Sequence, residues 1–380
     1  MRYYLILIYN RSMKKICIII AISLLAMVAW WTLKPREGVQ RMVVEEVASG
    51  LEVPWSIAFT SEDRMLVTER PGRLRVIQNE VLLPQPLHVF PEVSTVGEEG
   101  LMSVVLDPEY DQSRFIYVSL AYKKDDGMAV KILRFRDGGS QLIDEKIILD
   151  GIPAAQYHAG CRMAFGPDGK LYITTGEATN GALAQDLKSL GGKILRINKD
   201  GTVPADNPFK DSPIWSYGHR NPQGIAWLKA KEMYSSEHGP SGFDGPEGGD
   251  EINHIMKGGN YGWPLVSHEN KKEGTVAPII LFTPAEAPGS LLIYSGKLFP
   301  QFANNLFFGA LRGEGIVRVV LDHANGDKVT YWEKLGNVRF GRIREVVESP
   351  DGSIYFSTSN RDGRGVPNSK DDRIFRVHAN

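Results

Sequence analysis

A strand–turn–strand pattern recurs six times along the chain, and this repeat constrains the fold more than any other feature. The pattern is clearest in RMAFGPDGKLYITTGE (162–177) and REVVESPDGSIYFSTSN (344–360), where a Pro-Asp-Gly turn joins two segments of alternating apolar residues. Alternation with a period of two predicts β-strands, and Asp and Gly favour the tight turn between them. Related versions of the pattern occupy residues 56–70, 101–122, 224–240 and 295–321.

The spacing of the repeats indicates their architecture. Repeats of about four strands that recur at intervals of roughly 45–70 residues are typical of a β-propeller. The 39 glycines and 22 prolines are spread along the chain, which favours many tight turns over long helices. We therefore predict an all-β fold, a six-bladed β-propeller that spans residues 43–380. A β-sandwich or a pair of barrels is the alternative.

The N-terminal segment differs in composition from the rest of the chain. Residues 16–33 carry no charge, and three basic residues stand just before them. An apolar run of this length preceded by positive charge predicts a membrane-spanning helix with its N-terminus in the cytoplasm. We expect residues 1–35 to be a signal-anchor or a cleaved signal peptide, and residues 36–42 a linker. The Trp pair that ends the run favours a retained anchor, which places the propeller outside the cytoplasm, membrane-anchored or, after cleavage, secreted.

Charge and cysteine content exclude two classes of protein. The chain has 44 Lys and Arg against 45 Asp and Glu, a net charge of −1. A nucleic-acid binder needs a basic excess to neutralise phosphates, so we expect no nucleic-acid partner. The two cysteines of the chain are too few for a disulfide scaffold.

Polar residues gather next to the first strand predicted for each blade. If these positions share one end of the central channel, they form a pocket with one or two imidazoles and several guanidiniums. Clustered guanidiniums indicate a polyanionic ligand held by bidentate contacts, and an imidazole is suited to act as a general base. The alternative is a set of surface or inter-blade ion pairs. The residues are Glu98, Glu99, His158, Arg162, His219, Arg220, Asn221, Gln223, Arg312, Arg342 and Arg344.

An acidic, glycine-rich segment lies between residues 235 and 264. Oxygen ligands on a loop rich in Gly and Pro suit a hard cation such as Ca²⁺. The spacing matches no EF-hand, and a solvated acidic loop is the alternative reading. The acidic residues are Asp244, Glu247, Asp250 and Glu251.

Together these motifs resemble the soluble quinoprotein glucose/sorbosone dehydrogenase family, and within it the aldose sugar dehydrogenases. The resemblance covers nearly the whole body, and its sharpest stretches are HAGCRMAFGPDGKLYITTGE, GHRNPQGIAW, SSEHGP followed by GGDEIN and KGGNYGWP, and GRIREVVESPDG. It implies an oxidoreductase that uses pyrroloquinoline quinone (PQQ) and Ca²⁺. Such an enzyme oxidises an aldose at C1 to a lactone and passes electrons to an external acceptor, which is unidentified here.

The resemblance also implies roles for individual residues. His158 matches the catalytic base, which takes the proton of the anomeric hydroxyl while C1 delivers hydride to the quinone. Gly239 and Pro240 match carbonyl ligands of a Ca²⁺ beside the cofactor, and Glu251 and Tyr261 match ligands of a structural Ca²⁺. The residues that match cofactor contacts are Glu98, Arg220, Asn221, Arg312, Arg342 and Arg344.

Two departures from the family pattern bear on function. Glu98 stands in GEEG where relatives commonly carry Gln or a single Glu, so a carboxylate faces a polyanion unless a cation offsets it. Tyr157 stands where glucose-specific members have Asp, which favours a broader or different aldose substrate. Two other functions remain open: a propeller without redox activity that binds carbohydrate or protein, and a Ca²⁺-dependent hydrolase of the lactonase type.

Overall fold

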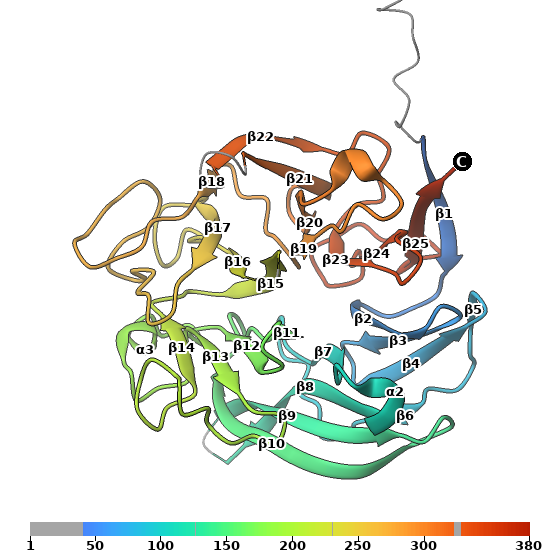
Figure 1. The fold of residues 1–380 in the computed structure, drawn as a ribbon, viewed down its shortest axis with the longest axis horizontal. Helices are drawn as coiled ribbons and strands as arrows, with labels where there is room; N and C mark the ends of the chain where they lie inside the picture. Colours follow the sequence, from blue (N-terminus) through green and yellow to red (C-terminus); the bar gives the residue numbers. More distant parts are fainter. Residues whose placement is uncertain (1–40, 126, 230, 323–327) are drawn as a thin grey trace, which may run out of the picture. The chain divides into compact units, whose positions relative to one another are not determined.

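The computed structural model describes residues 41–125, 127–229, 231–322 and 328–380. Six antiparallel sheets form the blades of a propeller around a central axis, which confirms the predicted all-β, six-bladed fold (Figure 1). The predicted anchor or signal helix and most of the predicted linker lie outside the described residues, and the domain boundaries stay predictions. Within the described ranges, no helix is long and apolar enough to cross a membrane.

The first three blades follow one another in chain order, each a meander of strands. Their strands are β2 (Pro54–Ser61), β3 (Arg64–Glu69), β4 (Arg73–Gln78), β5 (Val81–Leu82) and β6 (His88–Val89) in blade 1; β7 (Leu101–Leu106), β8 (Phe115–Lys124), β9 (Gly127–Asp137) and β10 (Leu142–Ala154) in blade 2; and β11 (Met163–Phe165), β12 (Leu171–Thr175), β13 (Lys193–Ile197) and β14 (Ile214–Tyr217) in blade 3. The short helices α2 (Tyr110–Ser113) and α3 (Ala182–Gln185) lie in their connections.

The last three blades repeat this order, with one 3₁₀ turn, η1 (Pro300–Phe302), in blade 5. Their strands are β15 (Pro222–Leu228), β16 (Glu232–Glu237), β17 (Asp250–Ile255) and β18 (Ile280–Phe282) in blade 4; β19 (Leu292–Ile293), β20 (Leu306–Ala310), β21 (Gly315–Asp322) and β22 (Lys328–Lys334) in blade 5; and β23 (Ile343–Glu348), β24 (Ile354–Thr358), β25 (Ile374–Ala379) and β1 (Met42–Ala48) in blade 6. In blade 5 the sequence repeat corresponds to the second and third strands, because the first strand is only two residues long.

The core is divided among the six interfaces between neighbouring blades, with one cluster of buried apolar residues at each. Side chains of one strand alternate between the two faces of its sheet and so serve two interfaces. In β20, Leu306 and Phe308 pack toward blade 4, whereas Phe307 packs toward blade 6. A blade is therefore stabilised by both neighbours.

The ring is closed by pairing the first strand of the chain with the last. β1 pairs antiparallel with β25, so both ends of the described chain contribute to blade 6. Beside this seam, the buried Asp372 carboxylate accepts hydrogen bonds from the backbone N–H groups of Val53 and Asn360, at 3.2 and 2.6 Å. These bonds join blade 6 to blade 1.

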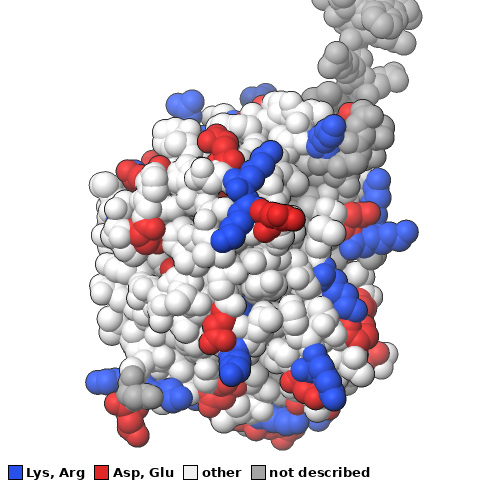
Figure 2. All heavy atoms as spheres, turned by 90° about the vertical axis from the view of Figure 1, so that its left-hand side faces the viewer, with Lys and Arg blue, Asp and Glu red and all other residues white. Residues whose placement is uncertain are grey.

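Acidic and basic side chains are interspersed on the molecular face that Figure 2 shows, and neither sign forms a large patch there. This mixture agrees with the near-zero net charge of the sequence. On that face the surface offers no stripe of positive charge for a phosphate backbone.

Candidate functional site

A cavity of about 650 Å³ lies at one end of the propeller axis. In a meander of antiparallel strands, the segment that enters the first strand and the connection between the second and third strands lie at the same end of the blade. Both kinds of segment line the cavity: His158 and Arg220 precede first strands, whereas Pro240 and Asp362 lie in second-to-third connections. Its size lies within the usual range of small-molecule sites, about 300–1,000 Å³.

The cavity brings together most of the residues singled out in the sequence: Glu98, His158, Arg220, Gln223, Gly239, Pro240, Arg312, Arg342 and Arg344. Asn221, Glu251 and Tyr261 lie outside its lining. Two expectations about position were wrong. Arg312 lies between β20 and β21, not before a first strand. Arg162 and His219 are buried away from the cavity, at 7% and 0% exposure.

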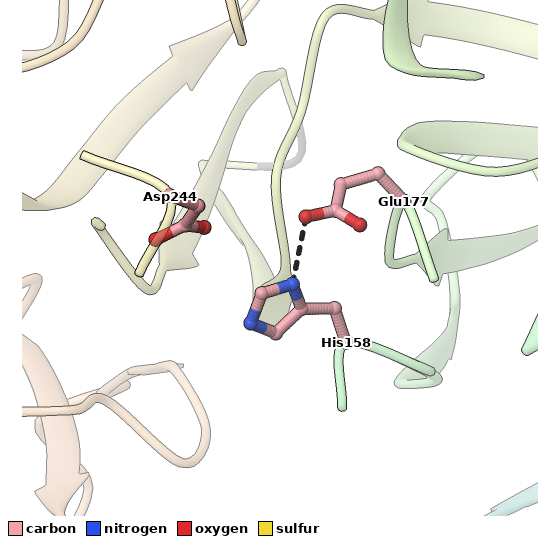
Figure 3. Close-up of side chains that lie close together, drawn as sticks. All are labelled: His158, Glu177 and Asp244. Atoms are coloured by element: carbon pink, nitrogen blue, oxygen red, sulfur yellow. Dashed lines mark hydrogen bonds and ion pairs between the residues drawn. The ribbon is translucent and has the colours of Figure 1, made fainter. Parts of the chain in front are cut away.

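His158 is held by a carboxylate that the sequence reasoning did not single out. Its Nδ1 lies 2.7 Å from Oε1 of Glu177, and both side chains are buried (Figure 3). A carboxylate only accepts, so Nδ1 carries the proton and Nε2 is the basic nitrogen. A Cβ on Gly176 would lie 1.9 Å from the carbonyl oxygen of His158, so only glycine allows the two segments to approach this closely.

Asp244 lies on the other side of His158 from Glu177, and the ligand atoms of the three residues lie within 4.8 Å of one another (Figure 3). Asp244 is paired with Arg220, whose Nε lies 2.6 Å from Oδ2 of the carboxylate. The ion pair holds the loop that carries Phe243, and the phenyl ring stacks on the imidazole of His158 with centroids 5.8 Å apart. Because Arg220 engages Asp244 and Glu177 engages Nδ1, we interpret the cluster as an oriented base rather than a metal centre.

The three buried guanidiniums at the cavity differ in how they are neutralised. Arg220 pairs with Asp244, and Arg342 lies 2.7 Å from Asp362. Arg344 has no carboxylate within ion-pair distance in the described chain, and its Nε has no hydrogen-bond partner there. Burial, together with the charges of Arg342 and Arg162, lowers the pKa of Arg344 to about 10, although Asp362 and Glu98 partly offset it. An uncompensated buried cation of this kind fits an anionic ligand.

Glu98 does not face the cavity as a free carboxylate. Arg364, from the β24–β25 connection, places Nη1 2.5 Å from Oε1 of Glu98. Burial alone would raise the pKa of Glu98, but the charges of Arg364, His238 and His158 hold it below its ordinary value. The repulsion that the sequence implied between Glu98 and a polyanion is therefore offset by a neighbouring cation.

The donors around the cavity fit a planar polycarboxylate. Nε of Arg344 and Nδ2 of the buried Asn221 have no hydrogen-bond partner among the residues described. Asn221 follows Arg220 in the chain. Because its Nδ2 donates no hydrogen bond within the described protein, a ligand can accept one without displacing a protein partner. Buried donors without partners are costly unless a ligand satisfies them.

Two places offer oxygen atoms to a hard cation. At the cavity, Asp250 accepts the N–H of Gly239 at 2.8 Å, and the carbonyl of Pro240 accepts the N–H of Gly248 at 3.2 Å. These bonds fix the turn that carries Gly239 and Pro240, both of which line the cavity. Away from the cavity, Glu251 stands opposite Glu237 across the β16–β17 pair. Burial and the charge of Glu237 raise the pKa of Glu251 to about 8. A buried and a half-buried carboxylate that stand opposite each other favour a divalent cation between them. The hydroxyl of Tyr261 donates to the carbonyl of His254 at 2.6 Å, so the expected contribution of Tyr261 to the site is its backbone carbonyl.

Arg162 crosses the central channel beneath the cavity. Its Nη1 lies 2.5 Å from Oε2 of Glu345 in blade 6, and its Nε donates to the carbonyl of Gln223 in blade 4 at 3.1 Å. Its Nη2 donates to the carbonyl of Gly289, before blade 5, at 2.9 Å, and its guanidinium lies 4.2 Å from the ring centroid of Trp55 in blade 1. One side chain from blade 3 thus ties four other blades together.

Glu99 lies beside the cavity, and its buried carboxylate predicts that the stability of the fold depends on pH. Both of its carboxylate oxygens are buried without a hydrogen-bond partner in the described part of the chain, and burial raises its pKa to about 8. Between pH 4.5 and 8 the folded protein binds more protons than the unfolded chain, so stability falls as pH rises. We expect Glu99→Gln to abolish this contribution. Urea midpoints at pH 5 and pH 8 should then differ less than in the wild type; an unchanged difference would contradict the assignment.

The sequence reasoning missed Glu177, Phe243, Asp362 and Arg364, and treated Asp244 only as an oxygen ligand. All five lie in connections between second and third strands, whereas the predicted pocket was placed at the entries to first strands. The antiparallel order of a blade was the available signal, because it places both kinds of connection at one end. Their pairing with His158, Arg342 and Glu98 depends on contacts between distant segments.

Comparison with known proteins agrees with this geometry. The family model described as Glucose / Sorbosone dehydrogenase matches residues 51–367. The chain is 38% identical to an Escherichia coli protein named aldose sugar dehydrogenase, over 84% of this chain and 91% of the relative. It is 29% identical to quinoprotein glucose dehydrogenase B of Acinetobacter calcoaceticus, over 82% and 84% of the two chains. A solved structure of a PQQ-bound aldose sugar dehydrogenase from Streptomyces coelicolor superimposes with a TM-score of 0.78 at 32% identity, over 90% of this chain and all of the other.

Proposed function

The chain belongs to the glucose/sorbosone dehydrogenase family, and we propose that it is a PQQ- and Ca²⁺-dependent enzyme that oxidises aldose sugars at C1 to lactones. The observation that carries the proposal is the convergence of an oriented base, His158, with an unpaired buried cation, Arg344, in one cavity. The segment of residues 1–35 directs the enzyme to the outer side of a membrane, and an external acceptor takes the electrons.

The protein residues bind, orient and move a proton. The carboxylates of PQQ are bound by the guanidiniums of the cavity, Arg344 among them, and by the amide of Asn221. When bound, PQQ supplies a two-electron acceptor for the hydride from C1. Nε2 of His158 takes the proton of the anomeric hydroxyl as the C1–O bond becomes a carbonyl. Glu177 holds the imidazole in the tautomer that makes Nε2 basic and stabilises the imidazolium that forms.

Two cation sites support this chemistry. The carbonyls of Gly239 and Pro240 would hold one Ca²⁺, which would supply a Lewis acid for the quinone. Glu251, with Glu237 opposite it and Tyr261 nearby, holds a structural Ca²⁺. Tyr157 and Phe243 both line the cavity, and their ring centroids lie 6.4 Å apart. We infer that the enzyme accepts several aldoses rather than glucose alone.

The experiment that tests the function is reconstitution of the full chain with PQQ and Ca²⁺. Dye reduction is followed with a panel of aldoses, and cofactor binding is followed by absorbance. We expect turnover that needs both additions. Lactone hydrolysis that needs no dye would favour the hydrolase instead, and an unchanged spectrum and melting temperature after PQQ is added would favour a binding module.

Glu177→Gln is expected to lower kcat by about 10²- to 10⁴-fold and leave KM nearly unchanged. The amide keeps the shape of the carboxylate, but it neither fixes the tautomer nor balances the charge of a protonated His158. Steady-state kinetics on the reconstituted enzyme measure the split. A rise in KM at constant kcat would show that Glu177 acts on substrate binding instead.

A further inference from the structure

Gln223 is the side chain that joins Arg344 to the segment carrying the base. It is the second residue of β15, is 4% exposed and lines the cavity. Its Oε1 accepts a hydrogen bond from Nη1 of Arg344 at 3.2 Å, and its Nε2 donates to the carbonyl of Gly160 at 3.3 Å. The same Nε2 donates to Oδ1 of Asn221 at 3.0 Å. One amide therefore contacts three segments that border the cavity.

The amide of Gln223 is neutral, so it leaves the charge of Arg344 uncompensated. Each of the other two buried cavity guanidiniums, Arg220 and Arg342, contacts a carboxylate. Arg344 contacts the neutral oxygen of Gln223, which orients the guanidinium without neutralising it. A Glu at 223 would have nearly the same shape, but it would form a buried ion pair with Arg344 and compete with an anionic ligand.

A second observation supports the same role. The Nδ2 atom of Asn221 has no partner in the described part of the chain, while its Oδ1 is occupied by Gln223. The bond from Gln223 therefore fixes which way the Asn221 amide is turned, with its free donor available to a ligand. Gln223 orients two donors at once and supplies no charge to either.

We propose that Gln223 is a positioning residue that aims Arg344 and Asn221 at the carboxylates of the cofactor and keeps the charge of Arg344 available to them. The inference rests on the proposed function, because it assumes that the anion is PQQ. It concerns affinity for the cofactor, so its test does not depend on turnover.

The test is a titration of Ca²⁺-loaded full-length protein with PQQ, followed by absorbance, for the wild type, Q223E and Q223M. We expect Q223E to weaken PQQ binding by about 50-fold, since it neutralises Arg344, and Q223M by only about fivefold, since it removes hydrogen bonds alone. Neither Glu nor Met can donate to Gly160 and Asn221, and a carboxylate also repels these two oxygens, so the Arg344→Met background separates an effect through Arg344 from the loss of these bonds. Equal losses, or an unchanged affinity in Q223E, would overturn the proposal.

Two controls keep the test decisive. Q112E adds one negative charge at an exposed position on α2 and should leave PQQ affinity unchanged. A second comparison does not need Q223E to fold, because it uses Q223M in an Arg344→Met background. There Q223M should lower PQQ affinity at most slightly, through Asn221. If Q223M lowered PQQ affinity as much as it does in the wild-type background, positioning through Arg344 would be contradicted. If the wild type itself does not bind PQQ, the proposed function fails before the variants are compared.

Discussion

Replacing His158 with alanine is expected to reduce turnover by about 10²- to 10⁴-fold while leaving PQQ affinity nearly intact. The imidazole is the buried base at the cavity, and its Nδ1 is committed to Glu177. Loss of a positioned general base typically costs a factor in this range. The measurements are kcat of the reconstituted enzyme and the dissociation constant for PQQ, so that loss of chemistry is distinguished from loss of cofactor.

A matched control removes an imidazole elsewhere. His378 lies in β25 and is not among the described residues that line the cavity, so His378→Ala should retain wild-type turnover. If His158→Ala kept turnover within a few-fold of the wild type, another group would have to accept the proton. The mechanism proposed for His158 would then be wrong.

Arg162→Met is expected to destabilise the propeller by about 3–5 kcal/mol. The substitution leaves Glu345 buried without its cation, and breaking a buried pair on one side costs roughly this much. Burial raises the pKa of Glu345, and Arg162 opposes that rise. Without Arg162 the folded-state pKa rises further above the unfolded value, so the loss should be small in acid and grow as pH rises.

The double variant Arg162→Met with Glu345→Met distinguishes a buried charge from lost packing. Removing both charges should recover most of the stability, because no uncompensated ion remains in the channel. Denaturant midpoints at pH 5 and pH 8 measure each variant. A double variant no more stable than Arg162→Met would show that the contacts of Arg162 to the backbone carbonyls, rather than its charge, hold the blades together.

Much of the fold follows from local sequence chemistry. Turn residues such as Asp168 act within a few residues of themselves: its Oδ1 accepts the N–H of Lys170 at 3.1 Å. Alternation along each strand, as in β20, is also local. These signals predict the strands and the number of blades. They do not predict the pairing of β1 with β25, which joins the two ends of the described chain.

In the candidate site, too, some features follow from local sequence and others from contacts between distant segments. The residue types near the blade entries are a local property of the chain, and they indicated His158, Arg220, Arg342 and Arg344 before any fold was known. The chemical states of these residues depend on the folded arrangement, because ion pairing requires short distances between segments far apart in the chain. Arg162 and Glu345 pair across 183 residues. Arg342 contacts a carboxylate, whereas Arg344 contacts an amide. This difference depends on how the blades converge on the axis.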